Sequence, residues 1–483
     1  MKRNTMKKIF LLTTIVFTVN IACAQWQADT RLTNDTNFSA TSFNGARTMT
    51  ASGNVLHVIW SEDRDGNREI YCKRSPDQGL SWGADVRLTN NIAGSIFPSV
   101  IASSSEVHVV WEEYRDGING EIYYKRSADG GLTWGTDTRL TFNPANSFSP
   151  SAAVSGSVVH VVWFDQRDGN NEIYYKRSPD GGLTWGADTT LTINIAASAF
   201  PSVAVSGSEV HVVWEEYRDG NGEMYYKRST DGGLTWGADT RLTFNAANSF
   251  SPSISVSGSL INIAWHDERD ANQEIYTKRS PDGGLSWGTD TRVTNDPSVS
   301  SYVSVTVSGS NVHVAWIDER DGNTELYYNR STDGGISWGG DARLTNDSAR
   351  STDPAVDVTG SIVHIVWTDA RDNFPVYTGN YEIYYKRDST GNALGVEDVM
   401  EDPVQQISIY PNPNNGTFYF STNKSINSGN IKTTLYNLSG KIIFEKKVNV
   451  NDRIKISNTD DGIYFLRITS ENYTVMKKFL IVK

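Results

Sequence analysis

The stretch Ser178-Pro179-Asp180-Gly181-Gly182-Leu183-Thr184-Trp185 decides the fold of this chain. The pattern S-x-D-x-G-x-x-W occurs six times, and the successive tryptophans are 52, 51, 51, 51 and 51 residues apart. A spacing this constant indicates one supersecondary unit copied in tandem. The six tryptophans are Trp82, Trp134, Trp185, Trp236, Trp287 and Trp338.

The aspartate of each copy has a local explanation. Its carboxylate can accept hydrogen bonds from backbone N–H groups of its own turn, while the glycines supply positive φ. We therefore expect a structural role for Asp77, Asp129, Asp180, Asp231, Asp282 and Asp333.

Each repeat predicts four short strands. In the fourth repeat we place them at residues 201–205, 210–214, 223–228 and 240–243, which are β-branched or aromatic runs bounded by Gly, Ser, Asn or Asp. Four strands in a unit of this length are typical of a propeller blade.

The second-strand tryptophan occurs seven times, although only six turns are complete. The last unit ends after Arg387 without a fourth strand, whereas residues 26–33 match the residues that follow the turn in other repeats. We expect this N-terminal strand to complete the seventh blade, which would remove exposed sheet edges. The second-strand tryptophans are Trp60, Trp111, Trp163, Trp214, Trp265, Trp316 and Trp367.

The repeated turn resembles the Asp-box of bacterial-neuraminidase-repeat proteins, a group of β-propellers that includes sialidases and several non-catalytic members. The resemblance covers residues 25–387 and implies an all-β propeller, which the tryptophan count makes seven-bladed. In that family the turn joins the third and fourth strands of a blade, on the face away from the active site. Because one fold hosts unrelated activities, the resemblance leaves the function open.

The N-terminal residues 1–24 have the pattern of a secretory signal peptide, with basic residues, an apolar run and small residues at positions 22 and 24. A lipoprotein signal with Cys23 as the lipidated residue is the alternative. Apart from Cys23 the only cysteine is Cys72, so we expect no intramolecular disulfide in the exported chain and a packing role for Cys72.

Residues 388–402 form an acidic linker, after which the composition becomes basic. Four motifs in residues 403–483 (409–413, 435–441, 461–466 and 477–483) resemble the C-terminal sorting domain of the type IX secretion system. The resemblance implies a small β-sandwich that directs the protein through the periplasm to the translocon and then to the cell surface or the medium. A carbohydrate-binding sandwich is the alternative.

Charge excludes some partners. Residues 25–402 carry a net charge of −22, and a domain this acidic repels polyanions. We therefore expect neither nucleic acid nor an anionic membrane as a partner. Separately, the second-strand histidines of neighbouring repeats are too far apart to share a metal ion, and arginine replaces an oxygen ligand in the Asp-x-Arg-Asp run, so we expect no metal. We also expect no cofactor and no stable transmembrane segment.

Every repeat places an acid, an arginine and an aspartate two, four and five residues after the second-strand tryptophan, and a glutamate at the start of the third strand. Seven copies indicate an ion-pair scaffold. Six histidines share one second-strand position, where Asn262 stands in the remaining repeat, and we expect them to be buried and hydrogen bonded. They are His57, His108, His160, His211, His313 and His364.

The positions one and three residues after each second-strand tryptophan vary between repeats. They lie on the opposite side of the strand from the repeated acid and arginine. We expect a ligand-binding face there, unless these side chains only fill the gaps between blades. The candidates are Glu112, Tyr114, Phe164, Gln166, Glu215, Tyr217, His266 and Glu268.

Two functions remain open from the sequence. The uniform blades and the absence of inserted pocket loops favour a secreted, non-catalytic propeller that binds a glycan or a surface protein. The Asp-boxes, Tyr114 and Tyr217 instead favour an exo-sialidase or a related glycosidase, which needs a tyrosine with a partner glutamate and an acid/base aspartate. The sequence has no R-I-P-type segment ahead of the repeats, and the arginines of the repeated loops all have neighbouring acids. We name no catalytic residue.

Overall fold

The computed structural model describes residues 26–34, 37–42, 47–373, 380–389, 408–410, 417–421, 431–437, 441–448, 453–456, 462–469 and 474–481. The predicted signal peptide and most of the predicted linker lie outside these residues. The chain divides into two compact units, Met1–Glu397 and Asp398–Lys483. The described residues form strands and one 3-10 turn, η1 (Arg371–Asn373), but no α-helix.

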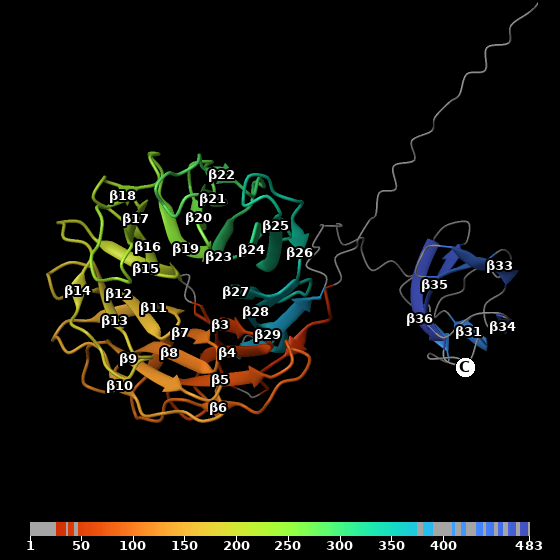
Figure 1. Ribbon diagram of the computed structural model, residues 1–483, viewed down its shortest axis with the longest axis horizontal. Coiled ribbons are helices and arrows are strands. Elements are labelled where there is room, and N and C mark those ends of the chain that lie inside the picture. Colours follow the sequence, from red (N-terminus) through yellow and green to blue (C-terminus); the bar gives the residue numbers. More distant parts are fainter. Residues whose placement is uncertain are drawn as a thin grey trace, which may run out of the picture. The chain divides into compact units, whose positions relative to one another are not determined.

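The first unit contains seven antiparallel sheets within the described residues, arranged around a common centre (Figure 1). The first strands lie innermost and are β3 (Met49–Ser52), β7 (Ser95–Ser103), β11 (Ser147–Ser155), β15 (Ser198–Ser206), β19 (Ser249–Ser257), β23 (Ser300–Ser308) and β27 (Ser351–Thr359). The second strands are β4 (Val55–Glu62), β8 (Glu106–Glu113), β12 (Val158–Asp165), β16 (Glu209–Glu216), β20 (Leu260–Asp267), β24 (Asn311–Asp318) and β28 (Ile362–Asp369).

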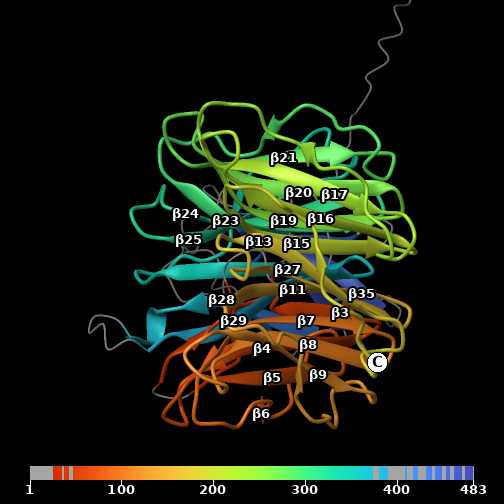
Figure 2. The same cartoon turned by 90° about the vertical axis from the view of Figure 1, so that its left-hand side faces the viewer.

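The third and fourth strands complete each sheet toward its outer edge (Figure 1), as β5 and β6 do at the lower edge of Figure 2. The third strands are β5 (Glu69–Ser75), β9 (Glu121–Ser127), β13 (Glu172–Ser178), β17 (Glu223–Ser229), β21 (Glu274–Ser280), β25 (Glu325–Ser331) and β29 (Glu382–Asp388). The fourth strands have two residues each: β6 (Val86–Arg87), β10 (Thr138–Arg139), β14 (Thr189–Thr190), β18 (Thr240–Arg241), β22 (Thr291–Arg292), β26 (Ala342–Arg343) and β1 (Thr30–Arg31). A short strand, β2 (Ser39–Ala40), also pairs with β4.

The fourth strand of the last sheet comes from the N-terminal end of the described chain. Strand β1 pairs with β29, with Thr30 opposite Tyr385 and Arg31 opposite Tyr384. The Leu32 N–H donates to the Ile383 carbonyl at 2.7 Å. The predicted pairing of the N-terminal segment with the last repeat is therefore present.

The core lies between adjacent sheets. The second-strand tryptophans are fully buried, and each stacks on a third-strand tyrosine of its own sheet, as Trp163 does on Tyr174 at 6.0 Å between ring centroids. Trp163 also belongs to an apolar cluster with Val110 and Tyr124 of the preceding sheet. Burial of such large aromatic side chains dominates core energetics, so neighbouring sheets stabilise one another.

The S-x-D-x-G-x-x-W turns also join neighbouring sheets. The Asp180 carboxylate accepts hydrogen bonds from the Thr184 N–H at 2.8 Å and the Thr184 hydroxyl at 2.6 Å. These bonds lower the pKa of Asp180 to about 2. Trp185 packs edge-on against Tyr124 of the preceding sheet at 4.9 Å. A Cβ at Gly182 would overlap the Tyr124 hydroxyl, so the close approach requires glycine.

The second-strand histidines are buried, as predicted, and most bond a third-strand tyrosine. His108 Nδ1 lies 2.7 Å from the Tyr124 hydroxyl, and the same contact recurs at His160, His211, His313 and His364. Buried Cys72 replaces the tyrosine in the first sheet, where His57 instead contacts the Gly130 carbonyl at 3.0 Å. Burial raises the pKa of Cys72 to about 12. Cys72 therefore packs in place of an aromatic ring.

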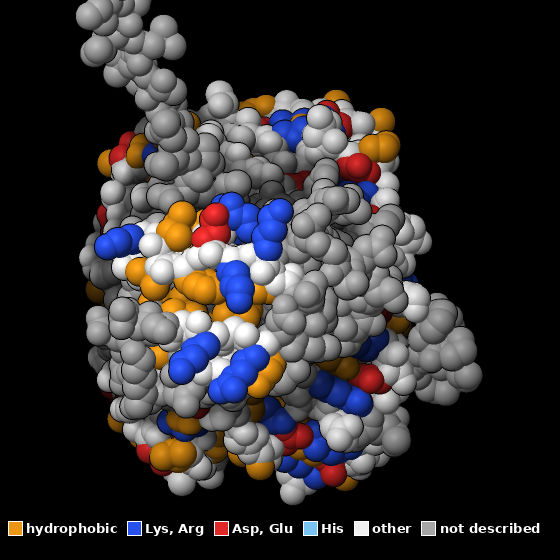
Figure 3. Space-filling model, turned by 90° about the vertical axis from the view of Figure 1, so that its right-hand side faces the viewer, with side chains coloured by type: hydrophobic (Ala, Val, Ile, Leu, Met, Phe, Trp, Pro, Cys, Tyr) orange, Lys and Arg blue, Asp and Glu red, His pale blue; other side chains and the backbone are white. Residues whose placement is uncertain are grey.

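The second unit consists of two antiparallel sheets in the described residues, β30-β31-β34 and β33-β32-β35-β36. Its core contains Phe418, Leu435, Leu466 and Ile468. Its exposed basic side chains include Lys441, Lys446, Lys447, Arg453 and Lys455; Figure 3 shows a face on which Lys and Arg side chains lie around a hydrophobic area. The strands are β30 (Ser408–Tyr410), β31 (Thr417–Ser421), β32 (Ile431–Tyr436), β33 (Ile442–Val448), β34 (Ile454–Lys455), β35 (Gly462–Thr469) and β36 (Thr474–Ile481).

Candidate functional site

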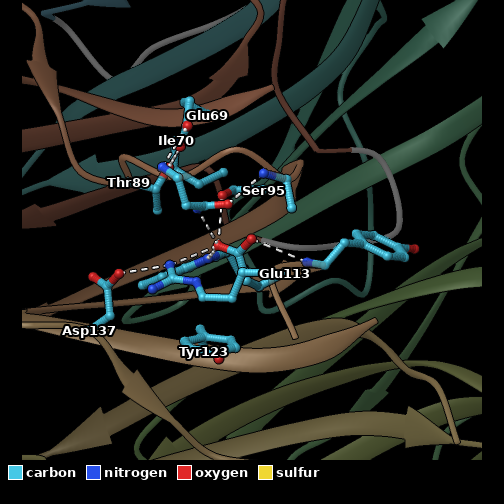
Figure 4. A network of polar contacts seen from close by, with 12 residues as sticks. Glu69, Ile70, Thr89, Ser95, Glu113, Tyr123 and Asp137 are labelled. Carbon is cyan, nitrogen blue, oxygen red and sulfur yellow. Dashed lines mark hydrogen bonds and ion pairs between the residues drawn. The ribbon is translucent and has the colours of Figure 1, made fainter. Parts of the chain in front are cut away.

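A polar network supports the loops that join the second and third strands, and Figure 4 shows the copy around Glu113. In the β7–β10 sheet the Glu113 carboxylate accepts hydrogen bonds from the Trp111 indole at 3.0 Å, the Ser95 hydroxyl at 2.8 Å and the Arg115 guanidinium at 2.9 Å. Arg115 also pairs with Asp137 at 2.7 Å. The predicted ion-pair scaffold is therefore present.

A second set of bonds supports the start of each third strand. Glu69 accepts hydrogen bonds from the Thr89 hydroxyl and from Arg87, the latter at 2.9 Å, while the Ile70 N–H donates to the Thr89 hydroxyl at 2.8 Å. These bonds tie the strand β5 to the segment that follows β6. Satisfied buried networks of this kind rigidify a structure.

The loop arginines are all engaged in this scaffold. Each of the seven pairs with the acid two residues before it, so each guanidinium already contacts a carboxylate. The pairs are Arg64–Glu62, Arg115–Glu113, Arg167–Asp165, Arg218–Glu216, Arg269–Asp267, Arg320–Asp318 and Arg371–Asp369. The ion pairs of these seven arginines hold the loops between the second and third strands in place.

The variable positions separate into two levels. The first member of each predicted pair is buried between sheets: Glu112 and Glu215 are 1% exposed, His266 is 5% and Phe164 is 8%. The second members, Tyr114, Gln166, Tyr217 and Glu268, reach the surface. Only the second members of the pairs are accessible to a ligand without rearrangement.

A β-bulge in the next sheet lies against the buried first members of the pairs, as at Glu112 and Glu215. Six first strands contain a non-glycine residue with φ near +50° at their third position, where the pairing register shifts. The Ser149 N–H donates to Glu112 at 3.3 Å, and the Ser251 N–H donates to Glu215 at 3.2 Å. The bulge residues are Phe97, Ser149, Phe200, Ser251, Tyr302 and Asp353.

Six of the eight predicted residues come together in two groups. The Tyr114 hydroxyl donates to Glu112 at 2.5 Å, and the Tyr217 hydroxyl donates to Glu215. Burial raises the pKa of Glu112 to about 7, although the hydrogen bonds from Tyr114 and Ser149 act in the opposite direction. Burial likewise raises the pKa of Glu215. Each group therefore presents a tyrosine supported by a buried carboxyl.

The two groups also share the same hydrogen bonds to an asparagine of the following loop. The Gly120 N–H donates to the Asn146 side-chain oxygen at 3.0 Å, and the Asn146 amide donates to Gln166 at 3.0 Å. In the other group the Gly222 N–H donates to Asn248 at 3.0 Å, and the Asn248 amide donates to Glu268 at 3.0 Å. We call Glu112, Tyr114, Gly120, Asn146 and Ser149 the first Tyr–Glu site, and Glu215, Tyr217, Gly222, Asn248 and Ser251 the second Tyr–Glu site.

The other two predicted residues lie elsewhere. Phe164 packs between Phe148 at 5.2 Å and Phe200 at 5.6 Å. His266 packs between Phe250 and Tyr302, and burial lowers its pKa to about 4. Both side chains fill gaps between sheets, the alternative that the sequence left open.

Sequence reasoning missed two exposed phenylalanines in the loops that lead to β11 and β19. Phe142 is 73% exposed and Phe244 is 72% exposed. The guanidinium of Arg139 lies 5.0 Å from the Phe142 ring centroid, and that of Arg241 lies 4.9 Å from the Phe244 centroid. A shallow hollow of about 520 Å³ is lined in part by Ala247, which follows Phe244 in the same loop, and by Glu268, Gln273 and Val299. The sequence did contain a signal for them, because phenylalanine follows Leu-Thr in these two repeats where most others have asparagine.

A cavity of about 310 Å³ lies where the seven first strands meet, and its charged lining residues are Arg47 and Asp357. Asp357 accepts backbone hydrogen bonds from Ala51 and Val358, each at 2.9 Å, and Arg47 donates to the Ile254 carbonyl at 3.3 Å. These contacts join β3 to β27 and reach across to β19. Sequence reasoning selected neither residue, although Asp357 is the only acid at its first-strand position.

The described residues include no group of three or more His, Cys, Asp or Glu that could hold a metal ion. They also form no helix with the length and hydrophobicity that a membrane span requires.

The fold is similar to that of propellers that act on polysaccharides. An ulvan lyase of family PL25, bound to -[GlcA(1-4)Rha3S]-, has a TM-score of 0.52 at 13% identity, covering 74% of this chain and 94% of that chain. The polysaccharide lyase Uly1 has a TM-score of 0.50 at 9% identity, covering 72% and 90%. The phage phi92 endosialidase has a TM-score of 0.47 at 10% identity, covering 94% and 87%. At these identities the likeness shows the fold alone.

Residues 408–483 match the family described as the secretion system C-terminal sorting domain. A type IX sorting domain indicates a protein that is exported through the periplasm and is secreted or held at the cell surface. The propeller-like fold and the sorting domain expected from the sequence are thereby confirmed. No curated protein matches the sequence of the chain.

Proposed function

We propose that this protein is a secreted or surface-held propeller that binds a glycan without cleaving it. In this proposal residues 25–387 form seven blades closed by β1, residues 388–402 link them to the sorting domain of residues 403–483, and the type IX translocon is the export partner. The ring closure is supported by the β1–β29 pairing and by the single cavity that all seven first strands line.

The engagement of the loop arginines carries the functional proposal. An arginine suits a planar carboxylate or sulfate because its fork can donate two parallel hydrogen bonds. Here the seven loop arginines each pair with an acid of the same loop, and residues 25–402 have a net charge of −22. This environment disfavours the anionic polysaccharides suggested by the similar structures and favours a neutral glycan.

The two Tyr–Glu sites supply suitable groups for such a ligand. The exposed Tyr217 offers a ring face, Asn248 and Glu268 offer polar atoms, and Phe244 lies on the same loop as Asn248. Ligand sites combine apolar surface with a few placed polar groups, which is what these residues provide.

A glycosidase of sialidase type is the second candidate, and one observation favours it. Tyr114 and Tyr217 each bond a glutamate two residues earlier, which gives the tyrosine and glutamate that such an enzyme requires. Burial raises the pKa of each tyrosine. The hydrogen bond to the neighbouring glutamate, and the charge of that glutamate, raise it further. The loop arginines weigh against this candidate, because each already contacts an acid of its own loop.

Incubating the purified protein with a fluorogenic sialoside and a panel of other aryl glycosides separates the two functions. We expect no release above the enzyme-free control. Turnover that disappears in Tyr114→Phe or Tyr217→Phe would replace the binding proposal with the glycosidase one.

A further inference from the structure

The two Tyr–Glu sites are copies of one constellation. Residues 111–117 and 214–220 share the sequence W-E-E-Y-R-D-G, and residues 146–151 and 248–253 share N-S-F-S-P-S. Each site combines a second–third strand loop with the bulged start of the next sheet. The equivalent hydrogen bonds have nearly equal lengths, as in the 3.0 Å bonds from Gly120 to Asn146 and from Gly222 to Asn248.

The remaining repeats lack this constellation. At the tyrosine position they have Asp63, Gln166, Glu268, Glu319 and Ala370, and at the glycine position they have Arg68, Asn171, Gln273, Thr324 and Tyr381. The glycine matters because space is short there. A Cβ at Gly120 would lie 3.2 Å from a Glu112 carboxylate oxygen, and one at Gly222 would lie 3.2 Å from the Ser249 carbonyl oxygen. Glycine and tyrosine therefore occur together in two repeats only.

An exposed aromatic side chain follows the same distribution. Phe142 and Phe244 occupy matching loop positions, each with an arginine stacked on its ring. Ile193 stands at that position in the sheet between them, and asparagine stands there in the other repeats. The exposed apolar side chains thus lie on consecutive sheets that connect the two Tyr–Glu sites, so an extended ligand could contact both sites and the residues between them.

From this repetition we infer that the protein has two equivalent glycan-binding sites on one face, separated by one sheet, and that its ligand is a neutral polysaccharide with a repeating unit that occupies both at once. This inference rests on the proposed glycan-binding function. Two linked binding events raise the overall affinity without any new contact, because the second becomes intramolecular.

Isothermal titration calorimetry with short probes counts the sites. Cellotriose, maltotriose, mannotriose and N-acetylchitotriose are each titrated separately into the protein lacking only residues 1–24. We expect at least one of them to bind with a stoichiometry of two. Tyr114→Ala and Tyr217→Ala should each reduce it to one and leave the affinity of the other site unchanged, a pattern that a general loss of stability would not give. The double variant should not bind, and Glu319→Ala, which changes the matching position of another sheet, should still bind two.

Variants with a precedent in the chain guard against misfolding. Gly120→Asn and Gly222→Asn introduce the residue that Asn171 provides at the same position in the β11–β14 sheet, and they should block one site each. A stoichiometry of one in the unmodified protein would overturn the two-site inference and leave the glycan-binding function intact. Failure of all four probes to bind would overturn both.

A polymer of the repeat that binds tests the bridging of both sites. Retention of the protein on the immobilised polymer should last at least ten-fold longer than that of Tyr114→Ala or Tyr217→Ala. Equal retention of the three proteins would overturn bridging.

Discussion

An oxygen of the Asp29 carboxylate lies 2.6 Å from the guanidinium of Arg371, although the two residues are 342 positions apart in the sequence. Asp29 also pairs with Lys386 at 2.9 Å. In the β11–β14 sheet the corresponding partner of Arg167 is Asp188, which comes from the same repeat. The N-terminal segment therefore contributes to the last sheet both a strand and the acid that its polar network needs.

Removing residues 25–34 tests this closure. The deletion would expose the edge of β29 and remove Leu32 from an apolar cluster with Tyr385. Because an unpaired strand edge recruits other chains, we expect a lower urea midpoint and self-association on size-exclusion chromatography. Asp29→Asn, which keeps the strand, should cost only about 1–2 kcal/mol. A truncated protein that stays monomeric with an unchanged midpoint would contradict the closure.

The buried histidines predict how stability depends on pH. Burial lowers the pKa of His211 to about 4, below the ordinary value of 6.5, so the unfolded chain binds more protons than the folded one between these values. Stability is therefore complete above pH 6.5 and is lost as the pH falls toward 4, by about 1 kcal/mol per pH unit for each such histidine.

The substitution His211→Asn measures one of these contributions. Asn262 already occupies the position in another sheet, where Thr277 stands in place of the tyrosine. Urea unfolding at pH 7 and pH 5 should show a smaller loss of stability for the variant than for the unmodified protein. An identical loss would mean that His211 is not buried as the neutral form.

Glu112 predicts the opposite dependence. Its pKa is raised to about 7 mainly by burial, so the folded state resists ionisation of this carboxyl. The penalty is absent below about pH 4.5 and complete above pH 7, up to about 3 kcal/mol. Glu112→Gln should thus gain stability relative to the unmodified protein between pH 5 and pH 8. Phe164→Leu, a change at the matching position of the next sheet, should give the same difference at both pH values. A Glu112→Gln effect that does not vary with pH would show that Glu112 is solvated.

Much of the fold could be predicted because the repeat compares the chain with itself. The strands of the fourth repeat followed from its β-branched and aromatic runs. The source of the missing strand followed from the alignment of Trp26 with Trp236. In one sheet Asn262 and Thr277 replace the histidine and the tyrosine together. Comparison of the repeats therefore also indicates which side chains contact each other.

The site was harder to predict because its geometry depends on the next sheet. Residues Ser149 and Ser251 adopt positive φ without being glycine, so nothing in their side chains signals the bulge that covers Glu112 and Glu215. Alternation placed Glu112 and Tyr114 on one side but could not show which of them is buried. The glycines at 120 and 222 were the available signal, because the other repeats carry larger residues there.

Deleting residues 408–483 tests the export assignment in the producing organism. The truncated protein should accumulate in the periplasm, because the sorting domain is the part recognised at the outer membrane. Fractionation followed by immunodetection distinguishes periplasm, surface and medium. Arrival of the truncated protein at the surface would contradict the assignment.

The most direct test of the glycan-binding account is a glycan array probed with the protein lacking only residues 1–24 and with its Tyr114→Ala/Tyr217→Ala variant. We expect the unmodified protein to bind neutral glycans in preference to sialylated, sulfated or uronic-acid glycans, and we expect the double variant to lose this binding. The control Glu319→Ala should bind as the unmodified protein does. Preferential binding to anionic glycans, or binding that survives in the double variant, would contradict the account.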